Sequence, residues 1–88
     1  MNLLAELLKL SRISLGGGDR LQYQSGGRVI LRRPDGSEIV IADALIAPKE
    51  FDEFIAGLER GGQLTAEPCE GGGVACYRML WRGNSVGW

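Results

Sequence analysis

The stretch RVILRRPDGSEIVIA, residues 28–42, decides the fold because it places two strand-forming runs around a strong turn. In the tripeptide PDG at 34–36, proline presets the backbone for the first central turn position, and Asp-Gly favours the chain reversal. Successive residues of a strand point to opposite faces, so Val29 and Leu31 share one face and Ile30 lies on the other. The stretch therefore predicts an antiparallel hairpin.

The residues before this hairpin predict further strands. Apolar and polar residues alternate in RISL, residues 12–15, and again in DRLQYQ, residues 19–24. The glycines at 16–18 lack the Lys-Ser/Thr pair of a phosphate-binding loop, so we interpret them as a hairpin turn. Another glycine turn at 25–27 leads into the 28–42 hairpin. Together these segments predict a meander of about four antiparallel strands.

Residues 48–60 predict an amphipathic helix. Pro48 suits the first helical turn, Arg60 lies near the negative end, and Gly61 can cap the helix. The apolar stripe has the spacing i, i+3, i+4, i+7 and consists of Phe51, Phe54, Ile55 and Leu58. We expect this stripe, with its two phenylalanines, to lie on the sheet.

A shorter helix is expected at residues 2–10, where Asn2 can serve as N-cap. The leucines at 3, 4, 7 and 8 fall on one helical face. A helix of this length does not persist alone, so it must dock on something. Two interpretations stay open: ordinary core packing, or a dimerisation helix that places Leu4 and Leu8 in a self-association surface.

A last hairpin is expected around the glycines at 71–73. In its second strand, alternation puts Tyr77 and Trp81 on one face and Arg78 on the other. A tryptophan near a chain end favours a pocket in its own domain or in a neighbour, so Trp81 and Trp88 join the predicted self-association surface.

These segments predict one α+β domain, residues 1–88. We expect an antiparallel sheet of about five or six strands in a hairpin meander, with the short N-terminal helix and the amphipathic helix packed on it. A chain of 88 residues fits a single domain. It buries only about 60–65% of the surface that its unfolded form exposes, so we expect modest stability or self-association.

The charges are unevenly distributed, although the net charge is only −1. Residues 1–34 carry six basic groups and two acids, whereas residues 35–70 carry nine acids and two basic groups. Two interpretations stay open: an electrically two-sided domain that steers an acidic partner, or two halves that pair with each other in the fold.

The residues of most catalytic and metal sites are missing. The chain has no histidine, which excludes Ser-His and Cys-His catalysis, and its two cysteines do not match zinc-site spacing. We therefore expect no enzyme activity, no metal and no cofactor. No apolar run approaches the roughly 20 residues of a membrane span, and no signal peptide is evident, so we expect a cytoplasmic protein. Cys69 and Cys76 are then expected to be reduced thiols, with a disulfide across the hairpin as the alternative.

Arginines mark the candidate binding surface. Arg28 and Arg32 share one strand face, Arg33 points to the other, and Arg20 lies on a neighbouring strand beside Tyr23. We predict that these five residues bind a partner, with the arginines recognising acidic groups. The alternative is a charged strand end that only keeps the protein soluble and discourages edge aggregation.

The segment LLAELLKLSRISLGGGDRLQYQ, residues 3–24, resembles the N-terminal docking domains of the tubulysin-synthetase type. In that family a short LLAEL helix leads into a hairpin built around a GDRL turn, and the basic edge strand of the hairpin captures an acidic short linear motif. The resemblance implies the same for this segment. From residue 25 onward the chain continues into further strands, where the family turns to a helix, so the resemblance implies nothing about the rest of the fold.

The sequence therefore predicts a non-catalytic interaction module of docking, adaptor or inhibitor type that binds an acidic protein segment. One alternative is a nucleic-acid-associated regulatory protein of a mobile element or phage, for which binding should weaken steeply with salt. Another is a small metal-independent hydrolase that uses paired carboxylates such as Asp52 with Glu53 or Glu67 with Glu70.

Overall fold

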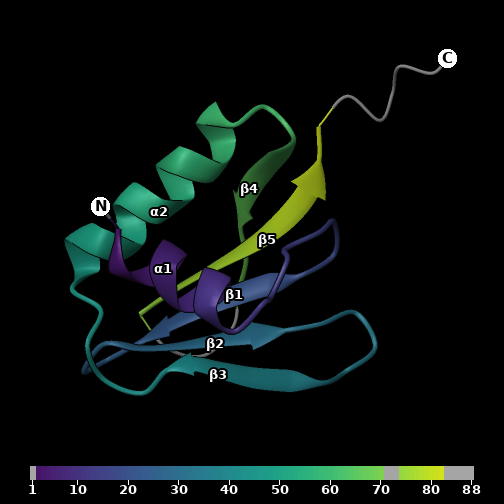
Figure 1. The fold of residues 1–88 in the computed structure, drawn as a ribbon. Coiled ribbons are helices and arrows are strands. Elements are labelled where there is room, and N and C mark those ends of the chain that lie inside the picture. The colour runs from purple at the N-terminus through teal and green to yellow at the C-terminus, as the bar shows by residue number, and fades with distance from the viewer. Residues whose placement is uncertain (1, 71–73, 83–88) are drawn as a thin grey trace, which may run out of the picture.

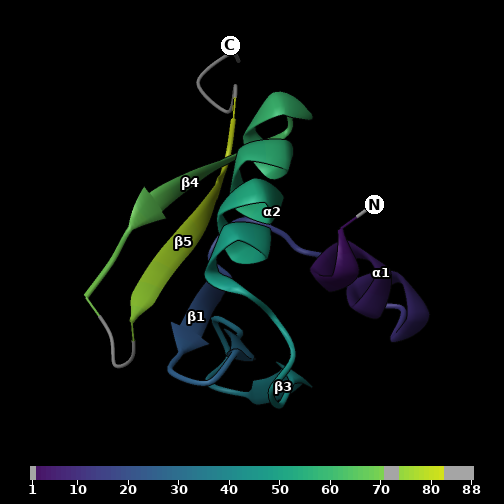
Figure 2. The same cartoon turned by 90° about the vertical axis from the view of Figure 1, so that its left-hand side faces the viewer.

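The chain folds as two helices on one face of a five-stranded antiparallel sheet (Figures 1 and 2). The computed structural model describes residues 2–70 and 74–82. The elements run in the order α1 (Leu3–Leu10), β1 (Arg20–Gln24), β2 (Arg28–Arg32), β3 (Glu38–Ala42), α2 (Pro48–Arg60), β4 (Leu64–Pro68) and β5 (Ala75–Trp81). The sheet order is β3-β2-β1-β5-β4, and the predicted α+β class is confirmed.

The β2–β3 hairpin forms as the PDG turn predicts. The Arg33 N–H donates to the Ser37 carbonyl over 2.9 Å, and the Gly36 N–H donates to the Arg33 carbonyl over 3.0 Å. Gly36 has a φ of 93°, a conformation that glycine adopts without steric cost. The Asp35 carboxylate accepts from the Ser37 N–H over 2.9 Å and so closes the turn from within. Sequence and local geometry agree at this turn, whereas at the far end of the hairpin the register shifts between Val29 and Ile30.

The expected strand at 12–15 is wrong. The chain runs from α1 to β1 as a loop, because β5 occupies the side of β1 that such a strand would need. The Gly18 N–H donates to the Met79 carbonyl, and the Met79 N–H donates to the Asp19 carbonyl, each over 2.8 Å. Gly17 belongs to this loop, where a Cβ would collide with the Trp81 indole. The glycines therefore make room for an aromatic ring and do not turn a hairpin.

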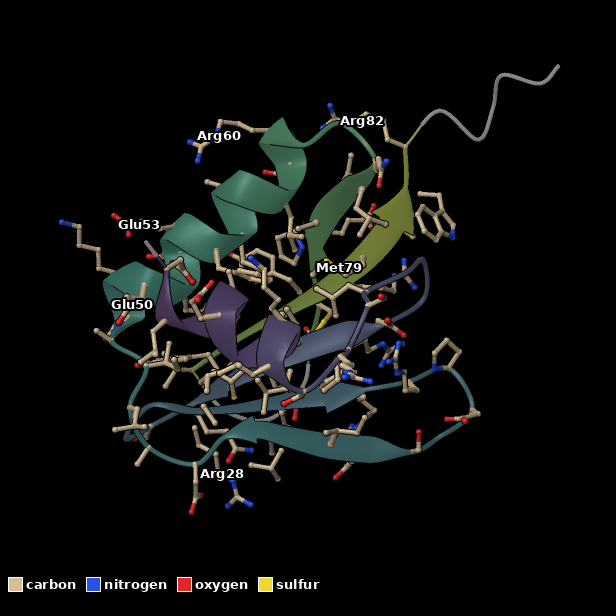
Figure 3. All side chains as sticks on the ribbon, viewed as in Figure 1. Arg28, Glu50, Glu53, Arg60, Met79 and Arg82 are labelled. Atoms are coloured by element: carbon tan, nitrogen blue, oxygen red, sulfur yellow. A yellow bond between two sulfur atoms is a disulfide. The ribbon has the colours of Figure 1, made fainter. Side chains whose placement is uncertain are left out.

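The core lies between the sheet and the two helices. Leu21, Leu31 and Met79 reach it from three neighbouring strands, and Figure 3 shows Met79 on the helix-covered side of β5. Phe51 of α2 is 1% exposed, and its ring centroid lies 5.1 Å from that of Tyr23. The predicted placement of the amphipathic helix on the sheet is confirmed.

α1 packs into the same core and docks on the start of α2. The Asn2 side chain accepts from the Ala5 N–H as the predicted N-cap, and it donates to the Glu50 carbonyl over 2.9 Å. Leu4 and Leu8 are buried against the protein's own sheet and α2. The prediction that these two leucines form a self-association surface is therefore wrong, because their apolar area is already covered within one chain.

A disulfide joins Cys69 and Cys76 across the β4–β5 hairpin, so the expectation of reduced thiols is wrong. The Cys69 N–H donates to the Cys76 carbonyl over 3.0 Å, which brings the two residues opposite each other at a Cα–Cα distance of 5.2 Å. This separation suits a disulfide. β4 and β5 pair antiparallel as predicted, whereas the proposed glycine turn at 71–73 and Trp88 lie outside the described residues.

In the part of the chain that the structure describes, no helix has the length and apolarity needed to cross a membrane.

Replacing Phe51 by alanine should lower the free energy of unfolding by about 3–5 kcal/mol, because the ring fills the centre of the core. The matched control is Leu10→Ala, since Leu10 is 79% exposed at the end of α1. Its cost should stay within about 0.5 kcal/mol. Urea unfolding followed by circular dichroism measures both. Equal losses in the two variants would contradict the packing of α2 on the sheet.

Candidate functional site

Three arginines lie side by side on the helix-free face of the sheet. Arg20 of β1 is the cross-strand neighbour of Arg32 on β2 and of Arg78 on β5. Residues in register on neighbouring strands point to the same face. The next residues, Leu21 and Leu31, point into the core, so the three arginines face away from the helices. We call Arg32, Arg20 and Arg78 the arginine row.

Acidic residues close both ends of the arginine row. Glu38 of β3 is in register with Arg32, and the Arg32 Nη2 to Glu38 Oε2 distance is 2.6 Å. Glu67 of β4 is in register with Arg78, at 3.0 Å from Arg78 Nη2 to Glu67 Oε1. Arg20 forms no ion pair with any residue that the structure describes. The central, exposed guanidinium thus stands between two others and is the one without a carboxylate.

The arginine row borders a cavity of about 390 Å³ at the β2–β3 turn. The cavity is lined by Gly18, Arg20, Arg32, Arg33, Pro34, Gly36 and Arg78. Guanidinium groups donate paired N–H bonds to carboxylate or phosphate oxygens, and neither an aromatic ring nor a carboxylate is among these lining side chains. Chemically, the arrangement can hold an anionic group.

Three buried side chains, one polar and two apolar, lie next to the arginine row on the same face of the sheet. Gln22, Ile30 and Cys76 are in register and are each 7% exposed or less. Both helices that the structure describes lie on the opposite face of the sheet. The arginine row therefore projects from paired strands, next to buried residues, and not from loops.

Arg33 has a different role from the adjacent Arg32. Its Nη1 donates to Asp19 Oδ2 over 2.8 Å and to the Ser14 carbonyl over 3.0 Å. The Asp19 side chain is only 3% exposed and also accepts from the Gly16 N–H over 2.9 Å. Arg33 thus fastens the α1–β1 loop to the β2–β3 hairpin, and it lines the cavity from that fixed position.

The structure separates the predicted binding residues into three groups. Arg20 and Arg32 come together in the arginine row, with Arg33 at its border. Arg28 lies at the far end of β2, below the edge of the sheet in Figure 3, and faces Asp43 at 3.7 Å. Tyr23 is 5% exposed and donates its hydroxyl hydrogen to the Ile46 carbonyl, so it cannot contact a partner and that prediction is wrong.

Sequence reasoning missed Arg78. Alternation already placed it on the face of its strand opposite Tyr77, but only the pairing of β5 with β1 brings it next to Arg20. The alternation of β5 gave the face on which Arg78 lies, but the order of strands along the chain did not indicate that β5 pairs with β1.

The uneven charge distribution has two structural outcomes. Arg28 and Arg32 pair with Asp43 and Glu38, so the two halves of the chain do meet in the fold. At the same time Glu50 and Glu53 lie on α2, as Figure 3 shows, in the layer that covers the other face of the sheet. The arginine row faces away from this acidic helix.

The GDRL segment forms no edge-strand hairpin. It leads into β1, which is the central strand of the sheet, so the basic edge strand implied by the family resemblance does not form there. Across residues 2–70 and 74–82, no three His, Cys, Asp or Glu side chains gather as a metal site would require. No protein-family model, curated protein or solved structure matches this chain.

The two adjacent arginines should differ sharply in their contribution to stability. Arg33→Met leaves the buried Asp19 carboxylate without its partner, and breaking such a pair costs about 3–5 kcal/mol. Arg32→Met removes an exposed pair worth about 0–1 kcal/mol, with both side chains more than a third exposed. Methionine retains the apolar stem in both variants. Urea unfolding compares them, and equal costs would contradict the assignment of Arg33 to the scaffold.

Asp35 should make the stability of the turn pH-dependent. Hydrogen bonds from the Ser37 N–H and hydroxyl, with a smaller effect of Arg33, hold the pKa of Asp35 below its usual 3.8. A depressed carboxyl pKa gives stability that is present above pH 3.8 and is lost as the pH falls through the folded-state value. Asp35→Asn should therefore be less stable than the wild type near neutral pH and equal to it in strong acid. Thermal unfolding at both pH values measures this, and a constant difference would contradict it.

Proposed function

We propose that this chain is a non-catalytic protein-interaction module of docking, adaptor or inhibitor type, and that it binds an acidic protein segment at the arginine row. The observation that carries the proposal is the order Glu38, Arg32, Arg20, Arg78, Glu67 across the five strands. The outer arginines have carboxylate partners, and the central one has none among the residues that the structure describes. A carboxylate from another chain fits at Arg20.

The existing ion pairs do not prevent such binding. In both outer pairs each side chain is between 41% and 52% exposed, and exposed pairs contribute only about 0–1 kcal/mol. A hydrogen bond to a charged group contributes about 1.5–3 kcal/mol once water is excluded from it. An incoming carboxylate can therefore draw Arg32 or Arg78 away from its own glutamate at small cost.

The size of the row suits a short acidic segment. Neighbouring strands lie about 4.8 Å apart, so three arginines span about 10 Å. Two carboxylates two residues apart in an extended segment are about 7 Å apart and fit within that span. Glu38 and Glu67 at the ends repel any continuation of negative charge. A nucleic acid backbone is continuous, and the cavity offers no aromatic ring for base stacking, so a peptide is favoured.

The resemblance of residues 3–24 to docking domains supports the same class of ligand. In that family the basic edge strand of the hairpin built around the GDRL turn captures an acidic short linear motif. Here the arginine of GDRL is Arg20, at the centre of the arginine row, and it lies on a central strand and not on an edge. The cytoplasmic location stays a prediction, and the Cys69–Cys76 disulfide counts against it, because disulfides are rare in cytosolic proteins.

Arg20→Met should weaken binding of a short Glu-rich synthetic peptide by about 10- to 100-fold, the equivalent of one lost charged hydrogen bond. Arg60→Met is the matched control, because Arg60 lies at the end of α2, away from the row (Figure 3). It should leave the affinity unchanged. Fluorescence anisotropy with the labelled peptide measures both, and added salt should weaken the wild-type affinity.

Two results would contradict the proposal. One is equal peptide binding by the wild type and Arg20→Met. The other is tighter binding of a single-stranded oligonucleotide than of the peptide, which would favour the nucleic-acid alternative. The peptide with glutamine in place of each glutamate serves as the ligand control, and binding of it at similar affinity would also count against a carboxylate site.

A further inference from the structure

The two edges of the sheet are protected to different degrees. At the β4 edge, the Ala66 N–H points outward and donates to Glu59 Oε2 of α2 over 3.3 Å. Pro68, two residues on, has no N–H to offer. These are devices that prevent another strand from pairing with an edge. β4 is therefore a guarded edge.

The β3 edge has free backbone groups. Arg33 and Ser37 are a hydrogen-bonded pair, and in an antiparallel ladder bonded and non-bonded pairs alternate. Ile39 therefore bonds to β2, whereas Glu38 and Val40 direct their N–H and C=O groups away from it. Within residues 2–70 and 74–82, no hydrogen bond beyond those of the strand pairs reaches these groups. Figure 1 shows no element beyond β3 on this side.

The side chains of β3 also permit a neighbour. Val40 is 47% exposed, and Ile39 packs only partly against the core. The charges nearby are already neutralised, because Glu38 pairs with Arg32 and Asp43 faces Arg28. The strand has no proline and no lysine, which are common guards of exposed edges. Its one register shift, another such guard, falls between Val40 and Ala42 and leaves the stretch Glu38–Val40 regular.

We infer that a second copy of this chain pairs antiparallel with β3, with Ile39 of both copies on the two-fold axis. In this register Glu38 of each copy lies opposite Val40 of the other. The outward N–H and C=O groups of both residues then form four backbone hydrogen bonds. Such a contact is isologous and closes as a dimer. It joins the two sheets edge to edge and leaves both arginine rows uncovered.

A second copy fits this edge better than the acidic segment does. In two identical strands, the outward N–H and C=O groups of Glu38 and Val40 all find partners in the other copy. The acidic residues near the edge, Glu38 and Asp43, are already paired with arginines in each copy. An acidic strand would meet Glu38 at its centre and compete with it for Arg32. The proposal is independent of the arginine row, because Arg20 lies on the face of the central strand and Val40 lies on the edge strand.

Val40→Glu should dissociate the dimer. Each new glutamate lies directly opposite Glu38 of the other copy, and like charges at opposed positions of paired strands destabilise the pairing. Val40 is exposed enough for the monomer to stay folded. The matched control is Val74→Glu, an equal substitution at a valine that is 65% exposed near β5, away from the β3 edge. Analytical ultracentrifugation over a concentration series should give a dimer for the wild type and the control, and an association at least tenfold weaker for Val40→Glu. Circular dichroism checks that each variant is folded.

Hydrogen exchange supplies a second measurement. The amides of Glu38 and Val40 should become more protected as the protein concentration rises, while the Leu64 amide at the guarded edge should not change. A wild-type monomer at every concentration would overturn the inference, and so would a dimer that Val40→Glu leaves intact. Protection at Val40 that appears only on adding the Glu-rich peptide would assign this edge to the acidic segment instead.

Discussion

The buried carboxylate of Asp19 is the constraint on which the functional surface depends. Its side chain accepts from Arg33 of the β2–β3 turn and from the Gly16 N–H of the α1–β1 loop. The backbone carbonyl of Asp19 accepts from the Met79 N–H of β5. Three separate parts of the chain therefore meet at the residue that immediately precedes Arg20. Together with the strand pairing, this meeting point holds the start of β1 between β2 and β5, where the arginine row assembles.

The adjacent residues Arg32 and Arg33 illustrate how burial divides identical side chains between two roles. Arg33 faces a carboxylate that is shielded from water, where a charge left unpaired is expensive, so its contact is structural. Arg32 faces solvent and an exposed glutamate, where the pair contributes little and exchanges readily. Strand alternation directs the two side chains to opposite faces. The buried pair of Arg33 is costly to break and the solvent-exposed pair of Arg32 is not. A binding surface needs the second kind of arginine, held in place by the first.

Local sequence patterns predicted the turns and helices that depend on contacts between residues close together in the chain. The PDG turn, the capped α1 and the phenylalanine stripe of α2 all formed as expected, because each depends on contacts within a few residues. The errors concern distant partners. Ile13 and Leu15 alternate as a strand would, yet β5 takes the place beside β1 that they would need. The disulfide and the position of Arg78 follow from the same kind of pairing, which a period-two pattern cannot specify because it gives the face of a residue and not its neighbour.

Pairing through β3 would change what the arginine row can recognise. An edge-to-edge dimer extends the sheet, so both rows face the same side. Arg20 and its equivalent are then separated by five inter-strand spacings, about 24 Å at 4.8 Å each. A partner with two acidic segments joined by a linker of that reach would bind both rows, and the second contact would be intramolecular. Exposed arginine pairs are individually weak, so this doubling would give a row of three arginines a useful affinity without a deep pocket. The free edge and the charged face would then serve one function.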